Sequence, residues 1–329
     1  MAALVSIITP CYNGERYLEK YFNSILSQTY PAIELIFVND GSSDRTEEMA
    51  LEYGERLKEK GYQFTYIYQE NAGQSAAINQ GLKIFKGKYL NWTDADNYLP
   101  DDSVEKRVEV LEANPNLGLV IGRSIAVDDE EYKQVGIISE TGFDRTSTKQ
   151  LIEDFLKGQI SCTCCCSTMV RSSMFLDSMP DPPQIETPRE IGQNYQLFIP
   201  ILFRHKTKYV PDVLGYYVVH NDSHSHTRKT FEQKLHILDV AKATLWSISD
   251  RIVVEESERT WFKDKISEYD CKNRLDTMQH YKRKDGLAEV VKELKTLDAY
   301  DSSARKMVLK IKYPYIKKLG DRLWRIRNR

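Results

Sequence analysis

Continuous apolar runs and helix-spaced apolar residues alternate along the first hundred positions of the chain. The continuous runs, rich in β-branched and aromatic residues, cover residues 5–10, 34–38, 62–68 and 89–93. Such runs are typical of strands buried on both faces of a parallel sheet. Between them, apolar residues at four-residue steps predict helices over residues 17–26, 49–57 and 74–85. The sequence therefore predicts an α/β fold in which strands and helices alternate.

The ends of these elements also have sequence signals. Pro10 is expected to end the first strand, because proline cannot continue a central ladder. Ser43 or Asp44 is expected to cap the second helix. In doubly wound parallel sheets, ligands bind beyond the carboxyl ends of the strands, so the residues that follow each strand are the candidate site.

After residue 100 the α/β pattern continues and then changes. We expect a helix from residue 100, a strand over 117–127, a helix over 149–156 and a strand over 160–170. A Pro-rich stretch, residues 177–190, predicts a long loop. From Thr230 onward apolar residues recur at helical spacing with no visible chemistry, which predicts a helical C-terminal region. The predicted domains are residues 1–228 and 229–329.

Two carboxylates, Asp94 and Asp96, follow directly on the fourth apolar run. At this spacing both leave the strand end on the same side, where they repel each other unless a cation lies between them. Mg²⁺ is usually bound by one or two carboxylates together with substrate phosphates. Taken alone, the pair is better explained as a solvated Asp-rich turn. The other strand ends favour the site, because they supply an aromatic ring, a carboxylate and amides, which suit a nucleotide.

Four blocks in this region resemble the N-terminal motifs of the family 2 inverting glycosyltransferases. They are VSIITPCYN (5–13), ELIFVNDGSSD (34–44), NAGQSAAINQG (71–81) and Asp94-Ala95-Asp96. The resemblance implies a GT-A fold, Rossmann-like with a mostly parallel sheet and flanking helices. It also implies a nucleotide-sugar donor, most often a UDP-sugar, and Mn²⁺ or Mg²⁺. No Rossmann dinucleotide fingerprint or P-loop competes with this interpretation.

Carried over residue by residue, the resemblance assigns roles at the strand ends. The implied donor-binding residues are Pro10, Tyr12 and Asp40 around the base and ribose, then Asn71, Gly73, Gln74, Ser75, Asp94 and Ala95. The implied metal ligands are Asp96 and Asp94, with His220 of a later His-x-x-Ser-x-Ser element binding the metal or the departing diphosphate. One departure is Ile78, where the family often has arginine, so a positive contact to the diphosphate is either missing or supplied from elsewhere.

A second departure concerns catalysis. The stretch 192–197 resembles the family's Gly-Glu-Asp segment, whose aspartate is taken as the general base, but here the two positions are Gln193 and Asn194. An amide cannot accept a proton at neutral pH. A Gln-Asn version resembles a branch of bacterial polysaccharide transferases, in which Asn194 would orient the acceptor hydroxyl. We expect Glu190 to accept the proton, with Glu186 and Asp181 as alternatives.

Four of the six cysteines crowd into residues 162–166, CTCCC, which suits a reducing cytoplasm better than a disulfide framework. No second ligand pair supports a zinc site. Close packing of a strand is the preferred explanation, and a wall of the acceptor site is the alternative. The first residues lack a basic segment and a cleavage site, so we expect no signal peptide. No run of 18 uncharged apolar residues occurs, so no spanning helix is expected.

The charge of the chain is uneven although its net charge is only −2. Residues 303–329 hold ten Lys or Arg and one acidic residue, mixed with large apolar side chains and broken by Pro314 and Gly320. Short basic amphipathic segments of this kind lie on anionic membranes. The alternative is docking on the acidic remainder of the chain, and no nucleic-acid motif accompanies the charge.

The resemblance to family 2, together with the basic C-terminus, implies a cytoplasmic glycosyltransferase at the inner face of the cell membrane. Its expected acceptor is a glycan or a lipid-linked acceptor in bacterial cell-surface polysaccharide synthesis. The alternative is a non-catalytic, nucleotide-sugar-binding or scaffold subunit of a polysaccharide assembly, which Gln193 and Asn194 favour.

Overall fold

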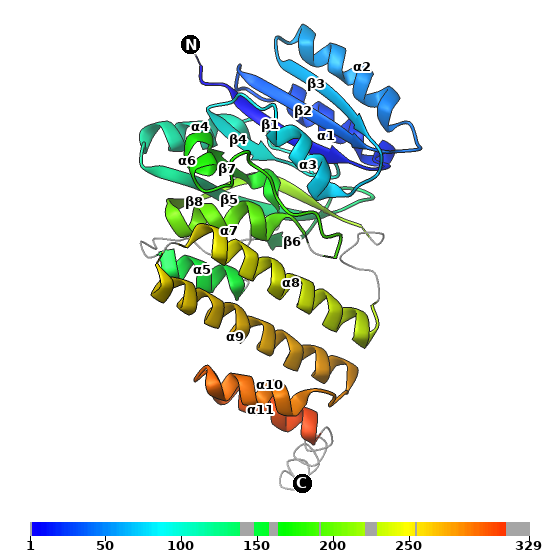
Figure 1. Cartoon of the computed structure of the whole chain (residues 1–329). Coiled ribbons are helices and arrows are strands. Elements are labelled where there is room, and N and C mark those ends of the chain that lie inside the picture. Colours follow the sequence, from blue (N-terminus) through cyan, green and yellow to red (C-terminus); the bar gives the residue numbers. More distant parts are fainter. Residues whose placement is uncertain are drawn as a thin grey trace, which may run out of the picture. The chain divides into compact units, whose positions relative to one another are not determined.

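The computed structural model describes residues 2–138, 148–157, 164–190, 192–220, 229–253 and 255–313. The chain divides into two compact units, residues 1–226 and 227–329. The first contains the sheet, and the described part of the second contains only helices (Figure 1). The domain boundary expected after residue 228 borders residues 221–228, which lie outside the described ranges.

A mixed sheet forms the centre of the first unit, and eight strands of it fall within the described residues. They are β1 (Val5–Cys11), β2 (Ile33–Asp40), β3 (Gln63–Gln69), β4 (Tyr89–Trp92), β5 (Leu117–Asp128), β6 (Gln134–Ile138), β7 (Thr168–Arg171) and β8 (Lys206–Val219). Their order is β3-β2-β1-β4-β7-β5-β6, with β8 also paired to β5. The first four strands are all parallel, whereas β7 is antiparallel to both β4 and β5.

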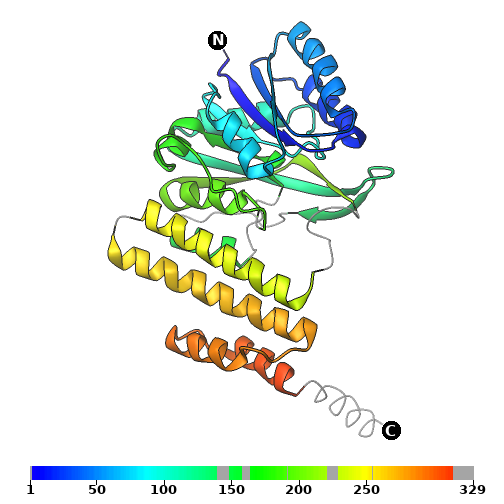
Figure 2. The same ribbon diagram turned by 45° about the vertical axis from the view of Figure 1, so that its right-hand side comes forward.

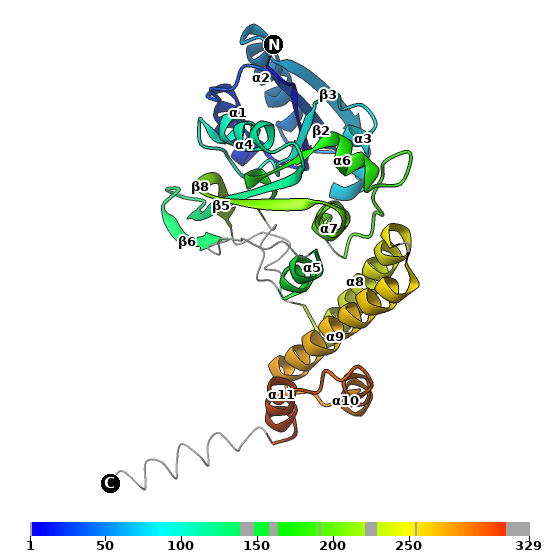
Figure 3. The same ribbon diagram turned by 90° about the vertical axis from the view of Figure 1, so that its left-hand side faces the viewer.

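Helices cover both faces of this sheet (Figure 3). They are α1 (Glu15–Leu26), α2 (Thr46–Glu59), α3 (Gln74–Leu82), α4 (Ser103–Ala113), α6 (Ser172–Asp177) and α7 (Asn194–Arg204). Helix α5 (Thr148–Leu156) packs against α7. Successive β1 residues point to opposite faces: Ile7 packs in one core with residues of α1, α2 and α4. On the opposite face, Ile8 lies against Gly81 of α3. Trp92 packs there between Phe175 and Phe198, with ring centroids 5.7 and 5.1 Å away.

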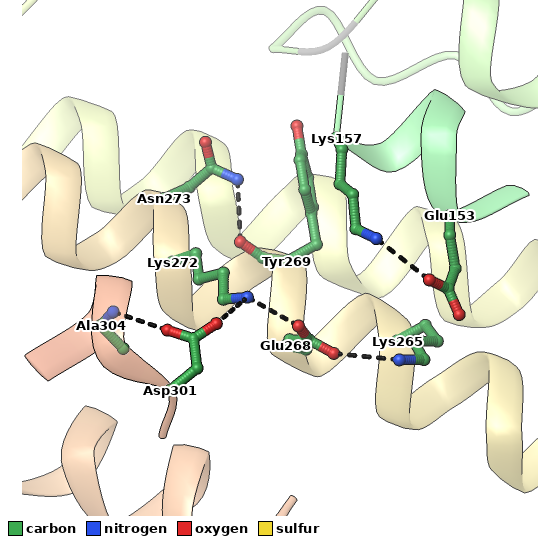
Figure 4. Close-up of polar contacts among 9 residues, drawn as sticks. All are labelled: Glu153, Lys157, Lys265, Glu268, Tyr269, Lys272, Asn273, Asp301 and Ala304. Atoms are coloured by element: carbon green, nitrogen blue, oxygen red, sulfur yellow. Dashed lines mark hydrogen bonds and ion pairs between the residues drawn. The ribbon is translucent and has the colours of Figure 1, made fainter. Parts of the chain in front are cut away.

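The second unit contains α8 (Phe231–Ile252), α9 (Glu256–Tyr281), α10 (Leu287–Thr296) and α11 (Ser302–Lys312). The long helices α8 and α9 lie side by side, and α10 and α11 pack against α9 (Figure 2). The Asp301 carboxylate caps α11 by accepting from the backbone N–H of Ala304 at 2.8 Å. Lys272 of α9 bridges Glu268 and Asp301 at 2.7 and 3.3 Å, which ties the cap to α9 (Figure 4). Within the described residues, no helix is both long and apolar enough to span a bilayer.

Several predicted boundaries were wrong for identifiable reasons. The first strand continues through Pro10 to Cys11. Strand β4 pairs with β1 only as far as Ile8, so no strand of the described residues lies on that side of Pro10 to accept the N–H that proline lacks. The second helix begins at Thr46, and Asp44 accepts from the Thr46 N–H at 3.0 Å without being the cap residue. The third helix ends at Leu82, three residues earlier than expected.

The strand expected over residues 160–170 was also wrong. Residues 158–163, which include Cys162, lie outside the described ranges, Cys165–Ser167 form a 3₁₀ turn, and β7 begins only at Thr168. Side chains of Arg107 and Asn91 donate hydrogen bonds to backbone carbonyls of residues 165–168, which a longer strand would use to pair with a neighbouring strand. The buried guanidinium of Arg107 donates to the carbonyls of Cys166 and Thr168 at 2.7 and 2.6 Å. The Asn91 amide donates to the Cys165 carbonyl at 2.9 Å.

Candidate functional site

The carboxyl ends of β1 to β4 meet at one edge of the sheet, because the four strands are parallel neighbours. The registers align Cys11 with Asn39 and Asp40 with Gln69. This edge therefore gathers the four predicted segments at residues 10–14, 40–44, 69–75 and 94–97. Two exposed aromatic rings stand at it, Tyr12 (53% exposed) after β1 and Tyr68 (56% exposed) near the end of β3. Tyr12 was expected there, and sequence reasoning missed Tyr68.

Asp40 fixes the loop that follows β3. Its Oδ1 accepts from the Gln69 side chain at 2.6 Å and from the Ala72 N–H at 2.8 Å, and its Oδ2 accepts from the Gly73 N–H at 2.9 Å. The Asn71 amide donates to the Asp40 carbonyl at 3.0 Å. Protein donors thus already occupy both carboxylate oxygens of Asp40. In this structure it holds residues 71–73 in place, a role that the sequence did not predict.

Gly73 allows the chain to enter α3. Its φ of 95° lies in the region that glycine favours, and it precedes α3 with no side-chain cap. Because glycine has no side chain, Gly73 cannot accept a hydrogen bond from the first N–H groups of α3 as a capping side chain would. Gln74, at the start of α3, donates from its side chain to Asp94 Oδ1. Ser75 beside it is buried.

Asp94 and Asp96 lie at the end of β4 with the buried Ala95 between them. Burial is the main cause that raises the pKa of Asp94 to about 7, and the nearby Asp96 charge adds to it while the Gln74 hydrogen bond opposes it. Asp96 Oδ2 lies 3.0 Å from His220 Nε2. That hydrogen bond raises the pKa of His220, against the effect of burial. Among the described residues, Asp96 Oδ1 is buried with no hydrogen-bond partner.

Asn97 places His220 opposite Asp96. Its side-chain oxygen accepts from the Val218 N–H of β8 at 3.0 Å, two residues before His220. Tyr98 and Tyr216 stack beside it with ring centroids 4.5 Å apart. The end of β8 is therefore pinned to the segment that carries the carboxylates. The rest of the His-x-x-Ser-x-Ser element, residues 221–225, lies outside the described ranges.

The carboxylate pair fits a divalent cation on two observations. Within the described ranges, Asp96 Oδ1 is buried and accepts no hydrogen bond. Burial and the Asp96 charge raise the pKa of Asp94. A cation between the two carboxylates would interact with Asp96 Oδ1 and would stabilise the charged form of Asp94. In the described part of the chain, no three His, Cys, Asp or Glu side chains cluster as a metal site. A cation held here would therefore take its other ligands from phosphate and water, as Mg²⁺ usually does.

Asn194 begins α7, and the buried Gln193 precedes it. The Cys165 thiol donates to Asn194 Oδ1 at 2.9 Å. Since the Cys165 carbonyl accepts from Asn91 of β4, two hydrogen bonds join the carboxylate-bearing strand to Asn194. Close packing of the cysteines is what the structure shows for Cys164, Cys165 and Cys166, all of them buried.

The three acidic candidates for the base occupy different places. Glu190 is exposed and lies four residues before Asn194. Glu186 is fixed to α7, because its backbone N–H and carbonyl bond the Gln196 side chain at 2.7 and 2.9 Å. Asp181 lines a hollow with Lys86 and Gly87, which precede β4, so it lies toward the opposite edge of the sheet.

Arg189 reaches the same edge, although no sequence signal distinguished it from other loop residues. Its Nη2 donates to the Asn71 carbonyl at 2.8 Å and to Asn71 Oδ1 at 3.0 Å. Its Cγ lies 3.5 Å from the point where a Cβ on Gly73 would be. Ile78, where the family often has arginine, is buried in the structure.

Comparison with known proteins identifies the family of the chain. The model of the family described as Glycosyl transferase family 2 matches residues 6–177. An uncharacterized glycosyltransferase of Rickettsia prowazekii is 41% identical over 118 residues, which are 36% of this chain and 35% of that protein. A poly-beta-1,6-N-acetyl-D-glucosamine synthase of Staphylococcus epidermidis is 35% identical over 119 residues, 36% of this chain and 28% of that protein. The match thus spans about a third of each relative's length.

Solved structures show the same fold at low identity. S. aureus TarS in complex with UDP-GlcNAc is 14% identical with a TM-score of 0.63, over 96% of this chain and 88% of that chain. The mannosyltransferase PcManGT from Pyrobaculum calidifontis, in complex with GDP-Man and Mn²⁺, is 16% identical with a TM-score of 0.55, over 98% and 88%. These likenesses confirm the predicted GT-A fold followed by a helical region.

Proposed function

Because the chain belongs to glycosyl transferase family 2, we propose that it transfers a sugar from a nucleotide-sugar to a hydroxyl group of a glycan or lipid-linked acceptor. We infer a UDP-sugar donor, inversion at the transferred carbon and a role in cell-surface polysaccharide synthesis. The observation that carries the proposal is the sheet edge where Asp94, Asp96 and His220 meet the Asp40 loop. The UDP-GlcNAc in TarS and the polysaccharide product of the S. epidermidis relative support it.

Each group at this edge has a chemical task in such a transfer. Asp94 and Asp96 would hold Mn²⁺ or Mg²⁺, which supplies charge stabilisation for the departing diphosphate. Tyr12 offers an exposed ring to cover the nucleotide base, beside the loop that Asp40 fixes. His220, which is hydrogen-bonded to Asp96, would donate to a phosphate oxygen as negative charge develops there.

Proton removal from the acceptor hydroxyl needs a separate group. Asn194 would orient that hydroxyl, because an amide donates and accepts hydrogen bonds but does not take a proton. We assign the proton acceptor to Glu190, which is exposed and precedes α7 by four residues. Asp181, near the opposite edge of the sheet, is the weakest of the three candidates.

A screen of nucleotide-sugars by thermal shift, with and without Mn²⁺, tests the donor. Stabilisation by a UDP-sugar that is larger with Mn²⁺ is the expected result, followed by donor hydrolysis or transfer in vitro. The alternative is a non-catalytic, nucleotide-sugar-binding subunit, which Gln193 and Asn194 favour. Binding without hydrolysis or transfer for any acceptor would support that alternative. No stabilisation by any nucleotide-sugar would contradict both.

We also propose that the protein attaches reversibly to an anionic membrane through α11 and the basic residues that follow it. Leu309 and Tyr313, four positions apart, are 53% and 56% exposed. Lys306, Lys310 and Lys312 of α11 are exposed as well. A basic face with exposed apolar side chains suits the headgroup region of an anionic bilayer. A transferase for lipid-linked acceptors works at such a surface.

A further inference from the structure

Among the described residues, Arg189 makes its hydrogen bonds with neutral groups alone, at the sheet edge where β1 to β4 end. Its two hydrogen bonds go from Nη2 to the carbonyl and side-chain oxygens of Asn71. Within the described ranges, no carboxylate lies close enough to Arg189 to form an ion pair, and its Nη1 and Nε groups make no further hydrogen bond. In the part of the chain that the structure describes, no group therefore uses the remaining N–H donors of the guanidinium at this edge.

Other cations near the edge are already engaged. Arg16 forms an ion pair with Asp129 at 2.9 Å. Lys20 lies over the rings of Tyr98 and Tyr132, 4.6 Å from each centroid. Arg189 differs from both because its partners do not neutralise or cover it.

A chain of hydrogen bonds fixes where Arg189 lies. The Asn71 amide that accepts from Arg189 donates in turn to the Asp40 carbonyl at 3.0 Å. The aliphatic part of Arg189 lies against Gly73, and the next residue, Gln74, hydrogen-bonds Asp94. Arg189 thus stands on the loop that adjoins the carboxylate pair. A Cβ at position 73 would be in ordinary contact with Arg189 Cγ at 3.5 Å, so it is the positive φ of Gly73, and not crowding by Arg189, that favours glycine there.

We propose that Arg189 binds the diphosphate of the donor nucleotide. A diphosphate beside Asp94 and Asp96 brings further negative charge to this edge, and a guanidinium matches phosphate oxygens with paired N–H donors. Ile78 is buried and apolar, so α3 supplies no cation at that position. Arg189 belongs to the loop before α7 and lies beside Gly73, so it would supply this positive charge in place of residue 78. This inference rests on the proposed function.

Isothermal titration of the full chain with UDP, with GDP and with uridine, in the presence of MnCl₂, tests the proposal. The variant Arg189→Ala is expected to bind UDP about 10- to 100-fold more weakly, as for the loss of hydrogen bonds to a charged group. Uridine, which has no phosphate, should bind the variant and the wild type within about twofold. Arg189→Lys should lie between them, because it keeps the charge without the fork. Arg56→Ala, an exposed arginine on α2, is the matched control.

The outcomes separate the two claims. If the wild-type chain binds neither UDP nor GDP, the proposed function fails. If it binds one of them and Arg189→Ala binds that diphosphate equally well, the Arg189 assignment alone is wrong. Equal loss of diphosphate and nucleoside binding would also overturn it, because it would show that Arg189 only supports the Asn71 loop.

Discussion

His220 Nε2 lies 3.0 Å from Asp96 Oδ2, although 124 residues separate them in the sequence. Asp96 follows β4 and His220 follows β8, two strands that are not neighbours in the sheet. Asn97 closes the distance by accepting from the Val218 N–H of β8. The second oxygen of Asp96 remains buried with no partner among the described residues. Asp96 could therefore bind a cation through Oδ1 while Oδ2 stays hydrogen-bonded to His220.

Replacement of Asp96 by alanine should abolish transfer, because it removes both the candidate metal ligand and the His220 partner. We expect the rate to fall by about 10²–10³ or more, the range for losing one charge-stabilising group. Stabilisation by Mn²⁺ in a thermal shift with nucleotide-sugar should disappear as well. Asp101→Ala, at an exposed aspartate five residues later, is the control and should keep both. Full activity of Asp96→Ala would remove the assignment.

The base assignment predicts different effects for neighbouring acids. Glu190→Gln should lower the transfer rate by about 10²–10⁴, the usual contribution of a general base. Donor binding should stay unchanged, since the acid acts on the acceptor. Glu186→Gln and Asp181→Asn should keep near-normal rates, because one is on a segment bonded to α7 and the other lies near the opposite edge. Normal turnover of Glu190→Gln with a loss in either of the others would show that the wrong acid was chosen.

Asn194 should affect the acceptor and not the donor. Asn194→Ala removes one hydrogen-bonding group, worth about 1 kcal/mol, so the acceptor KM should rise roughly five- to tenfold. UDP binding by calorimetry should not change. Cys165→Ala, which removes the thiol that holds Asn194 Oδ1, should show a smaller shift in the same direction, because a thiol is a weak donor. A change in UDP affinity in either variant would argue against this role.

Arg107 should matter for stability. It is fully buried and donates to three backbone carbonyls, those of Ser103, Cys166 and Thr168. Arg107→Ala removes these three hydrogen bonds, of which only the one to Thr168 leaves a carbonyl that Asn91 still serves as donor, and it opens a cavity, so the free energy of unfolding should fall by about 3 kcal/mol or more. Urea unfolding measures this, and Arg56→Ala on the surface should change it by less than about 0.5 kcal/mol. An unchanged urea midpoint for Arg107→Ala would mean that the turn at Cys165 does not depend on it.

Membrane attachment should depend on exposed basic residues of α11. The double variant Lys306→Glu, Lys310→Glu should lose most co-sedimentation with phosphatidylserine-containing liposomes, since each basic residue contributes about 1 kcal/mol near an anionic surface. Lys58→Glu, Lys83→Glu makes the same charge change at exposed positions of the first unit and should bind normally. Truncation must come after Tyr313, because Ala304, Val308 and Ile311 of α11 belong to the core of the second unit. Equal binding by all forms, or none by the wild type, would contradict the proposal.

The sequence by itself determined the elements whose signals are local. Continuous β-branched runs predicted β1, β2 and β4, because strands buried on both faces must be apolar throughout. The parallel arrangement followed from their alternation with helices, and it brought Tyr12, Asp40, Asn71 and Asp94 to one edge. The blocks at those strand ends were sufficient to indicate the family.

Only the tertiary structure decided relationships between distant segments. Arg107 and Asn91 take carbonyls from a stretch whose composition predicted a longer strand, so hydrogen bonds from other elements overrode the local pattern there. The Asp40 carboxylate accepts hydrogen bonds from the loop after β3, and Asn97 accepts from the Val218 N–H and so places His220 beside Asp96. Residue spacing along the chain predicts neither contact. Arg189 is one loop arginine among many in sequence. Its position over Gly73 exists only because the loop before α7 folds back onto the end of β3, where the Asn71 oxygens hold its guanidinium.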